Sequence, residues 1–287
     1  MDIPEKENTL LAVKKLGRPT KEMVAERERL KLERLRPVLT DEEVLADIKA
    51  RFKMMESLTE AAGRGDIPAM VIPGAPGVGK SFTVVRALDK AKVKYVRVSG
   101  GISAIELYTL AYHHRARGNV ILLDDCDIVF REEDTINVLK SLTDSSTVRT
   151  VSWRKQTASL KAEEIPDSYE FRGSIIFISN LDFQEIIDDG KSKYAAHLAA
   201  LTSRSLYLDA AVHDRRSLDL WVQWIAIQGR MVECEGLSVE QGKEMLDWMS
   251  KQREKLREYS LRTLHKLCGL VKLGPEWKEA ARLTLCR

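Results

Sequence analysis

Short hydrophobic runs alternate with amphipathic segments along the middle of the chain. The apolar runs predict strands over residues 69–73, 94–99, 120–124, 174–179 and 205–209. The segments between them, together with the one that precedes the first strand, predict helices over residues 41–62, 80–91, 103–116, 133–143 and 192–203. Continuous apolar strands that alternate with helices are typical of a parallel sheet covered on both faces.

The pattern becomes entirely helical near the carboxyl end. Helices are predicted near residues 214–230, 238–255, 259–272 and 275–286. Trp221 and Trp224 lie one helical turn apart, and we expect them in the core of this helical part. The charged segment 21–36 predicts a helix that ends before Pro37. We therefore expect an N-terminal helical arm over 1–40, an α/β domain over 41–211 and a helical domain over 212–287.

A glycine-rich segment joins the first predicted strand to the helix that follows it. It matches the phosphate-binding pattern G-x-x-x-x-G-K-[ST] with residues Gly74, Ala75, Pro76, Gly77, Val78, Gly79, Lys80 and Ser81. The glycines let backbone N–H groups turn towards phosphate oxygens, and the helix N-terminus adds its positive end. Lys80 can reach the β- and γ-phosphates, and the Ser81 hydroxyl can ligate Mg²⁺. We expect this segment, extended by Phe82, to bind ATP with Mg²⁺.

Two further strands end in polar residues that suit the same chemistry. The strand 120–124 ends in Asp124 and is followed by Asp125, so Asp124 can hold Mg²⁺ through water while Asp125 polarises the attacking water. The strand 174–179 is followed by Asn180, whose amide can orient that water and sense the γ-phosphate. The sequence therefore predicts ATP hydrolysis, with Lys80, Asp125 and Asn180 as catalytic residues.

These motifs, followed by a helical C-terminal part, resemble those of AAA+ ATPases, and the segments 171–180 and 200–204 resemble the small AAA+ ATPases of tailed bacteriophages. The resemblance implies a P-loop parallel-sheet domain with an all-helical lid. It also implies that Arg204 acts as an arginine finger in a neighbouring subunit's site and that Arg262 reaches the γ-phosphate from the lid. A homo-oligomeric ring or spiral, most often a hexamer, follows from a finger in trans. Most hydrolysing relatives carry Glu where this chain has Asp125, which leaves the rate open.

Two basic segments raise the question of a DNA partner. The sequence around Gly17, Arg18 and Pro19 resembles the minor-groove arms of AT-hook proteins, although a solvated basic loop explains it too. In the segment 147–156, Arg149, Trp153, Arg154 and Lys155 offer cations beside an aromatic ring. They form either a surface for single-stranded nucleic acid or a β-hairpin that packs Trp153 on Tyr169 or Phe171.

Composition narrows the setting but not the substrate. The net charge is only +3, so the chain as a whole is not a strongly basic nucleic-acid binder. We expect no membrane span, because no apolar run is long enough, and the first residues lack the pattern of a signal peptide. The four cysteines show no metal-ligand spacing, which predicts a reduced cytoplasmic setting, that of the host if the chain is phage-encoded.

The sequence therefore indicates an ATPase with three candidate roles. The first is a DNA motor or helicase-loader-like factor in phage replication or recombination. The second is a protein-remodelling chaperone or unfoldase-like motor, which would require a protein partner. Against it, Ile102 stands where protein-threading relatives usually place an aromatic pore residue. The third is an ATP-dependent assembly scaffold with slow hydrolysis.

Overall fold

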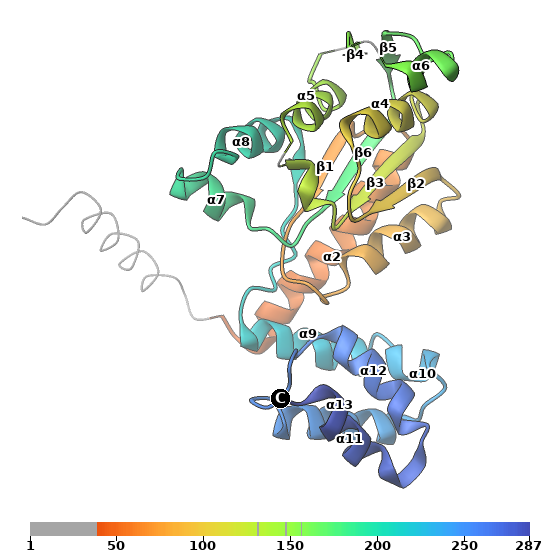
Figure 1. The fold of residues 1–287 in the computed structure, drawn as a ribbon. Coiled ribbons are helices and arrows are strands. Elements are labelled where there is room, and N and C mark those ends of the chain that lie inside the picture. The colour runs from red at the N-terminus through yellow and green to blue at the C-terminus, as the bar shows by residue number, and fades with distance from the viewer. Residues whose placement is uncertain (1–38, 131, 147, 156) are drawn as a thin grey trace, which may run out of the picture. The chain divides into compact units, whose positions relative to one another are not determined.

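A parallel sheet of five strands organises the larger part of the chain (Figure 1). The computed structural model describes residues 39–287 apart from residues 131, 147 and 156, so the predicted helix over 21–36 and Arg18 lie outside the described residues. The strand order is β2-β3-β6-β1-β7, and every neighbouring pair is parallel. The strands are β1 (Ala69–Ile72), β2 (Lys94–Ser99), β3 (Asn119–Asp124), β6 (Ser174–Ile178) and β7 (Leu206–Tyr207).

Alternate residues of the central strands enter two separate hydrophobic clusters, one on each face of the sheet. Val71 and Ile121 belong to the first cluster, whereas Met70 and Leu122 belong to the second. This explains why the strands read as continuous apolar runs, because both of their faces are buried. Helices α2 (Asp41–Gly63) and α3 (Lys80–Lys90) cover the face of the second cluster (Figure 1).

The opposite face is covered by a longer set of elements, whose buried side chains join the first cluster. They are α4 (Ala104–His113), α5 (Glu133–Leu142), α6 (Ala158–Ala162), α7 (Phe183–Asp189), α8 (Ala195–Arg204) and the antiparallel pair of β4 (Arg149–Ser152) with β5 (Ser168–Phe171). A 3₁₀ turn over Asp127–Phe130 follows β3. Helix α4 begins with a full capping box, in which Ser103 and Glu106 exchange hydrogen bonds.

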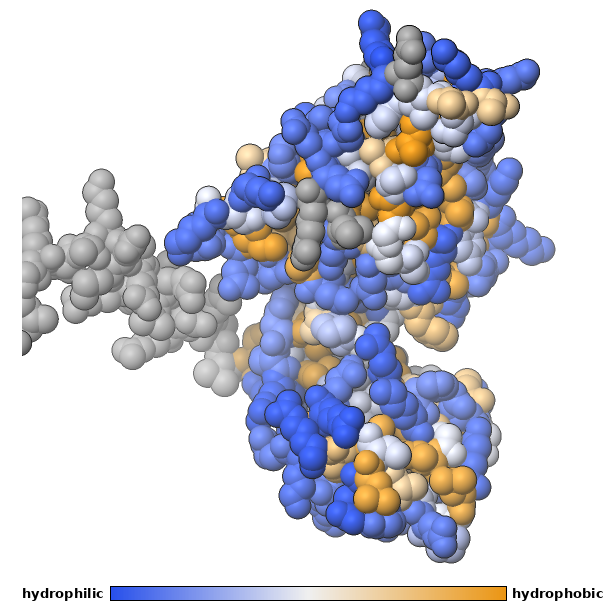
Figure 2. Space-filling view, viewed as in Figure 1, coloured by the Kyte–Doolittle hydropathy of each residue, from blue (hydrophilic) through white to orange (hydrophobic). Residues whose placement is uncertain are grey.

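The C-terminal part from residue 215 is helical and has its own hydrophobic cluster. Its elements are α9 (Arg215–Ile227), α10 (Met231–Cys234), α11 (Val239–Lys251), α12 (Leu261–Val271), a 3₁₀ turn (Gly274–Glu276) and α13 (Trp277–Leu285). Asp214, Ser238 and Ser260 cap three of these helices by accepting backbone N–H groups. On the face shown in Figure 2, hydrophilic residues dominate the surface around the hydrophobic ones.

Most predicted helices and strands are present with ends shifted by a few residues. The prediction over 238–255 is too long, because α11 ends at Lys251, and the predicted strand over 205–209 is only two residues long in β7. The short helices α6, α7 and α10 were not predicted, because four to seven residues are too few to establish a helical period. No helix in the described part of the chain is both long and apolar enough to cross a membrane.

Trp221 and Trp224 do not lie in the core of the helical part, so that prediction is wrong. Trp221 belongs to the second cluster, where its ring stacks on Phe52 of α2 at 4.4 Å between centroids and on Trp224 at 5.4 Å. Its indole N–H donates to the carbonyl of Val78 at 2.8 Å. Helix α9 has apolar residues on two faces, and the sequence pattern does not show which partner covers each.

Replacing Trp221 with alanine is expected to lower the free energy of unfolding by about 3–5 kcal/mol, because a large buried ring and its hydrogen bond are both lost. Urea denaturation followed by circular dichroism measures this change. The Trp224→Ala variant is the matched control, and its loss should be smaller because Trp224 is only partly buried. Equal losses for the two variants would show that Trp221 is not the principal contact between α9 and α2.

Candidate functional site

The polar residues predicted to act together lie at the carboxyl ends of three parallel strands. Strand β1 leads into the loop at residues 74–79, β3 ends at Asp124, and β6 is followed by Asn180. In the sheet β6 lies between β1 and β3, an order that the sequence analysis did not give. Asn180 therefore follows β6, whose two neighbours are β1, which leads into the loop, and β3, which ends at Asp124.

The loop owes its path to three glycines with left-handed backbone conformations. Gly74, Gly77 and Gly79 have φ angles of 128°, 73° and 102°, which residues with a Cβ rarely adopt. At Gly77 a Cβ would also lie 2.8 Å from the Ser260 side chain, so this position is closed to larger residues on two grounds. Val78 points into the core and is 1% exposed. The loop is thus anchored at one buried side chain while its glycines turn the backbone around it.

Lys80 begins helix α3, and its side chain returns over the loop. Its ammonium donates to the carbonyls of Gly74 at 2.5 Å and Ala75 at 2.8 Å and to the Asn180 amide oxygen at 3.3 Å. The residue is 5% exposed. Burial lowers the pKa of this ammonium from its usual 10.5 to about 8, and the carboxylates around it, with Asp125 and Asp124 first, act in the opposite direction.

If the loop binds ATP as the sequence predicts, this lowered pKa implies that the affinity falls as the pH rises through about 8. The protonated ammonium attracts phosphate and the neutral amine does not, so above that pH binding must take up a proton. Affinity should then fall by up to about tenfold for each pH unit, as measured by calorimetric titration. The Lys80→Arg variant keeps its charge at every accessible pH and should show a flat profile. A flat profile in the unmodified protein would contradict the assignment.

Asp124 is 2% exposed and accepts two hydrogen bonds from different elements. The Ser81 hydroxyl donates to Oδ1 at 2.8 Å, and the Arg97 guanidinium donates to Oδ2 at 2.5 Å. Hydroxyl and carboxylate oxygens that meet at this distance suit Mg²⁺, which prefers oxygen ligands and retains several waters. Ser81 and Asp124 therefore fit the metal role predicted for them. In the described residues no group of three or more His, Cys, Asp or Glu side chains could hold a metal ion.

Asp125 and Asn180 form a pair beside this acid. Asp125 is exposed and has a left-handed φ of 54°, and its backbone N–H donates to the carbonyl of Ile178 at 3.0 Å. The Asn180 amide donates to the Asp125 carboxylate at 2.8 Å while its oxygen accepts from Lys80. Asn180 thus connects the lysine to the carboxylate that is predicted to polarise water.

Arg97 is a site residue that the sequence analysis missed. It lies on β2, the neighbour of β3, and its Cα is in register with that of Leu122. The only available signal was a cation within a strand that precedes the acidic strand. Its charge beside Asp124 opposes the binding of a second cation by the same carboxylate.

Replacing Arg97 with leucine is expected to reduce the Mg²⁺ concentration needed for ATP binding by about two- to fivefold, the value of an ion pair that is half exposed. Titration of Mg²⁺ at fixed ATP measures this change. Arg86→Leu, which removes an arginine of α3 that pairs with Glu56, is the matched control. An unchanged or higher Mg²⁺ requirement in the Arg97 variant would contradict this expectation.

The C-terminal helices contact the loop directly. The backbone N–H of Leu261, the first residue of α12, donates to the carbonyl of Gly77 at 3.0 Å. Arg262 is the next residue, and its side chain is 55% exposed and lies 3.9 Å from Glu258. It is therefore held near the loop by the start of α12. Phe82, by contrast, lies on the outer side of α3 with 69% of its surface exposed.

Arg204 is the last residue of α8, and its guanidinium donates to the carbonyl of Ala200 in its own helix at 3.0 Å. In the described part of the chain it forms no ion pair and no hydrogen bond with the residues around Lys80. The structure thus leaves its predicted role in a neighbouring subunit as a prediction.

The segment 149–155 begins with strand β4, which pairs antiparallel with β5. Arg149 donates to the carbonyls of Leu142 at 2.8 Å and Gly173 at 2.7 Å. The Trp153 ring packs 6.1 Å from that of Tyr108, and its N–H donates to Thr157. Arg149 and Trp153 are therefore engaged within the protein, as in the packed alternative, although among the described residues the ring contact of Trp153 is with Tyr108 and not with Tyr169 or Phe171 as predicted.

The two remaining cations of this segment are exposed. Lys155 pairs with Asp134, and Arg154 points to solvent. They remain candidates for a DNA contact.

Comparison with known proteins gives one clear relative. An uncharacterised 36.7 kDa protein of enterobacteria phage T4, encoded in the nrdC-mobD intergenic region, is 35% identical over 245 residues. The match covers 84% of this chain and 75% of the phage protein. This chain belongs to the family of that phage T4 protein. No protein-family model matches the sequence.

Two solved structures that resemble this chain show only low sequence and structural similarity to it. An inhibitor-bound JCV helicase has a TM-score of 0.29 and 13% sequence identity, with 88% of this chain and 77% of the helicase covered. A further JCV helicase structure gives a TM-score of 0.28 with the same identity and coverage. Likeness at this level supports neither a shared fold nor a shared function.

Proposed function

We propose that this protein is a AAA+ ATPase that binds ATP with Mg²⁺ at residues 74–82. One observation carries the proposal. A continuous set of hydrogen bonds joins Lys80 to Asn180 and Asn180 to Asp125, while Ser81 is bonded to Asp124 beside them. The first turn of α3, which follows the glycine-rich loop, and the carboxyl ends of β3 and β6 supply these side chains. Such convergence of groups for phosphate, metal and water suits phosphoryl transfer to water.

Each side chain has a distinct task in this proposal. Lys80 binds the β- and γ-phosphates once it leaves the loop carbonyls, and Ser81 and Asp124 hold Mg²⁺, the latter through water. The bound metal neutralises charge on the phosphates. Asp125, which is exposed, accepts hydrogen bonding from the attacking water, and Asn180 orients it. Arg262 reports nucleotide state from the start of α12, and Arg204 completes the site of a neighbouring subunit.

We further propose that the assembly is a ring or spiral of identical subunits, most often a hexamer, that acts on DNA as a motor or helicase-loader-like factor. The relative from phage T4 supports a phage setting, and the role in replication or recombination rests on the resemblance of the sequence motifs. The exposed Arg154 and the adjacent Lys155 offer cations for such a partner.

The ATPase rate without additions, with single-stranded DNA, with duplex DNA and with an unfolded protein tests this role. The oligomer mass is followed with and without ATP. We expect stimulation by DNA and ATP-dependent assembly. Absence of both DNA binding and DNA stimulation at moderate salt would contradict the DNA role, and stimulation by the unfolded protein alone would indicate a protein-remodelling motor.

A slow ATP-dependent scaffold is the second candidate, and one contact favours it. Asp125 has a shorter side chain than glutamate, and its carboxylate is already bonded to the Asn180 amide at 2.8 Å. Both features keep the carboxylate away from an attacking water. ATP-dependent assembly with negligible turnover in the same assay would support the scaffold. The Asp125→Glu variant should then turn over faster.

A further inference from the structure

A basic cleft lies at the end of the sheet opposite to the proposed ATP site. It is formed at the amino ends of β2 and β3, whereas Asp124 marks the carboxyl end of β3. Its volume is about 490 Å³. The residues that line it are Lys94, His113, Arg115, Ala116, Asn119, Glu170 and Arg172. No motif in the proposed ATPase uses these residues.

Backbone packing fixes the two arginines of the cleft relative to each other. The backbone N–H of Arg172 donates to the carbonyl of Arg115 at 2.8 Å, which joins the turn after β5 to the end of α4. Gly173 allows this approach, because a Cβ there would lie 2.5 Å from the carbonyl oxygen of His114. The Arg115 guanidinium lies 3.9 Å from the centre of the Tyr112 ring and donates to that residue's carbonyl. Arg115 is thus held in place while it remains exposed.

Positive charge exceeds negative charge in the cleft. Lys94 and Asn119 lie side by side as the first residues of neighbouring strands, and no ion pair neutralises Lys94 within the described part of the chain. Glu170 is the single acid among the lining residues, and both of its oxygens are taken by Arg172, at 2.8 Å and 3.0 Å. The cleft therefore presents two uncompensated cations, Lys94 and Arg115, beside a neutral amide donor.

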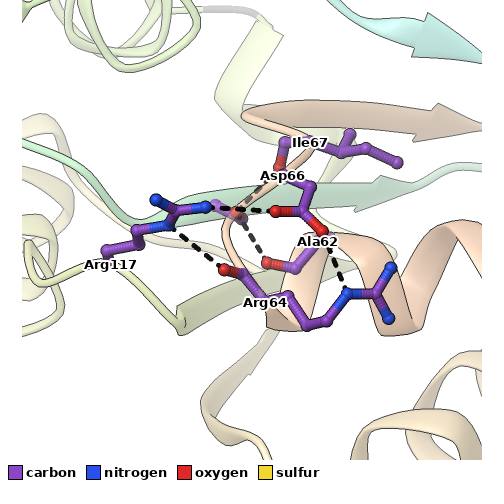
Figure 3. A network of polar contacts seen from close by, with 6 residues as sticks. Ala62, Arg64, Asp66, Ile67 and Arg117 are labelled. Carbon is purple, nitrogen blue, oxygen red and sulfur yellow. Dashed lines mark hydrogen bonds and ion pairs between the residues drawn. The ribbon is translucent and has the colours of Figure 1, made fainter.

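The excess of positive charge continues next to the cleft (Figure 3). Arg117, between the lining residues Ala116 and Asn119, shares the carboxylate of Asp66 with Arg64, at 3.1 Å and 2.9 Å. Arg117 also donates to the carbonyl of Arg64 at 3.3 Å. Two arginines against one acid leave a further net positive charge on this edge. The positively charged side chains therefore cover a larger area than a site for one small anion requires.

We propose that this basic cleft binds the phosphodiester backbone of nucleic acid. The donors are exposed ammonium and guanidinium groups and the partly buried Asn119 amide, which suit a chain of phosphates. Ala116 is the single apolar lining residue, so the cleft lacks the hydrophobic centre expected of a protein-binding surface. A site for one small anion would enclose it with buried donors, whereas here the side chains of Arg117 and Arg172 are 65% and 68% exposed. Binding through such groups is strongly dependent on salt.

The inference deepens the proposed DNA role and can fail independently of the ATP site. Binding of a fluorescein-labelled thymidine oligomer is measured by fluorescence anisotropy without nucleotide, over a series of salt concentrations. The protein is compared with the double variant Lys94→Gln/Arg115→Gln. The control double variant Lys53→Gln/Lys243→Gln removes two exposed lysines from α2 and α11. A labelled duplex, a labelled RNA and unlabelled inorganic phosphate as competitor form the further arms.

Each phosphate contact contributes about 0.7 to the slope of log affinity against log salt for a single strand. Loss of two contacts should lower the slope by about 1.4 and weaken binding about 20-fold at about 0.1 M salt. The control variant should bind like the unmodified protein, and the cleft variant should keep its ATP affinity and melting temperature.

Three results would contradict nucleic-acid binding by the cleft. They are no oligomer binding by the unmodified protein, equal weakening of binding by both double variants, or displacement of the oligomer by millimolar phosphate. A Lys80→Ala variant that still binds the oligomer separates the cleft from the ATP site. If that variant keeps ATP binding while the cleft behaves as expected, the proposed ATPase site is wrong and the cleft stands.

Discussion

Replacing Lys80 with alanine is expected to abolish ATP binding and ATP turnover. The ammonium is the only cation that the described structure places inside the loop, where it bonds to the carbonyls of Gly74 and Ala75. Hydrogen bonds to charged groups contribute about 1.5–3 kcal/mol each. Loss of two such bonds to phosphate therefore weakens binding by at least about 100-fold. Titration with a fluorescent ATP analogue measures the affinity, and phosphate release measures turnover.

The Lys90→Ala variant is the matched control, since it removes an exposed lysine from the end of the same helix. It should bind ATP like the unmodified protein. Because Lys80 is buried, its removal can also disturb the loop, so Lys80→Met serves as a second variant that retains most of the side-chain volume. Unchanged ATP affinity in both Lys80 variants, with normal thermal melting, would refute the assignment of the loop.

Replacing Arg204 with alanine should reduce the ATPase rate by roughly 10³ or more and leave ATP affinity unchanged. An arginine supplied by a neighbouring subunit stabilises charge only in the transition state. Arg204 suits this role because, within the described part of the chain, its guanidinium donates to one carbonyl of its own helix and has further donors for a neighbouring subunit. Steady-state hydrolysis and ATP titration on the same preparation separate the rate from the affinity.

Mixing the Lys80→Ala and Arg204→Ala variants tests directly whether Arg204 acts in a neighbouring subunit's site. In a mixed oligomer, an Arg204→Ala subunit with intact Lys80 can receive the arginine of a Lys80→Ala neighbour. Activity should therefore reappear on mixing, up to a fraction set by the random arrangement of subunits. No recovery in confirmed mixed oligomers would show that Arg204 does not act across the subunit boundary. Normal hydrolysis by Arg204→Ala alone would refute the finger altogether.

The sequence was sufficient to predict which residues of the candidate site come together where local patterns determine their positions. The loop glycines, Lys80 and Ser81 follow a fixed spacing, and Asp124 and Asn180 follow apolar strands whose ends meet at one sheet edge. The structure places Lys80 in hydrogen-bonding contact with Asn180, and Ser81 in contact with Asp124.

What the sequence did not reveal depends on which strands and helices become neighbours. Arg97 reaches Asp124 only because β2 pairs with β3 in a specific register, which no local pattern encodes. Trp221 packs on α2 rather than within the helical part for a similar reason, since an apolar helix face does not identify the surface that covers it. The basic cleft combines residues from four separate segments, and their individual charges are unremarkable in sequence.

The contacts of Val78 and Gly77 have a mechanical consequence. Their carbonyls accept hydrogen bonds from Trp221 of α9 and from the backbone of Leu261 in α12, at 2.8 Å and 3.0 Å. A swing of the C-terminal helices away from the sheet must break both bonds or pull the loop with it. Each bond contributes about 1 kcal/mol to holding the helices against the loop. A displacement of the helices that keeps both bonds must therefore move the loop as well.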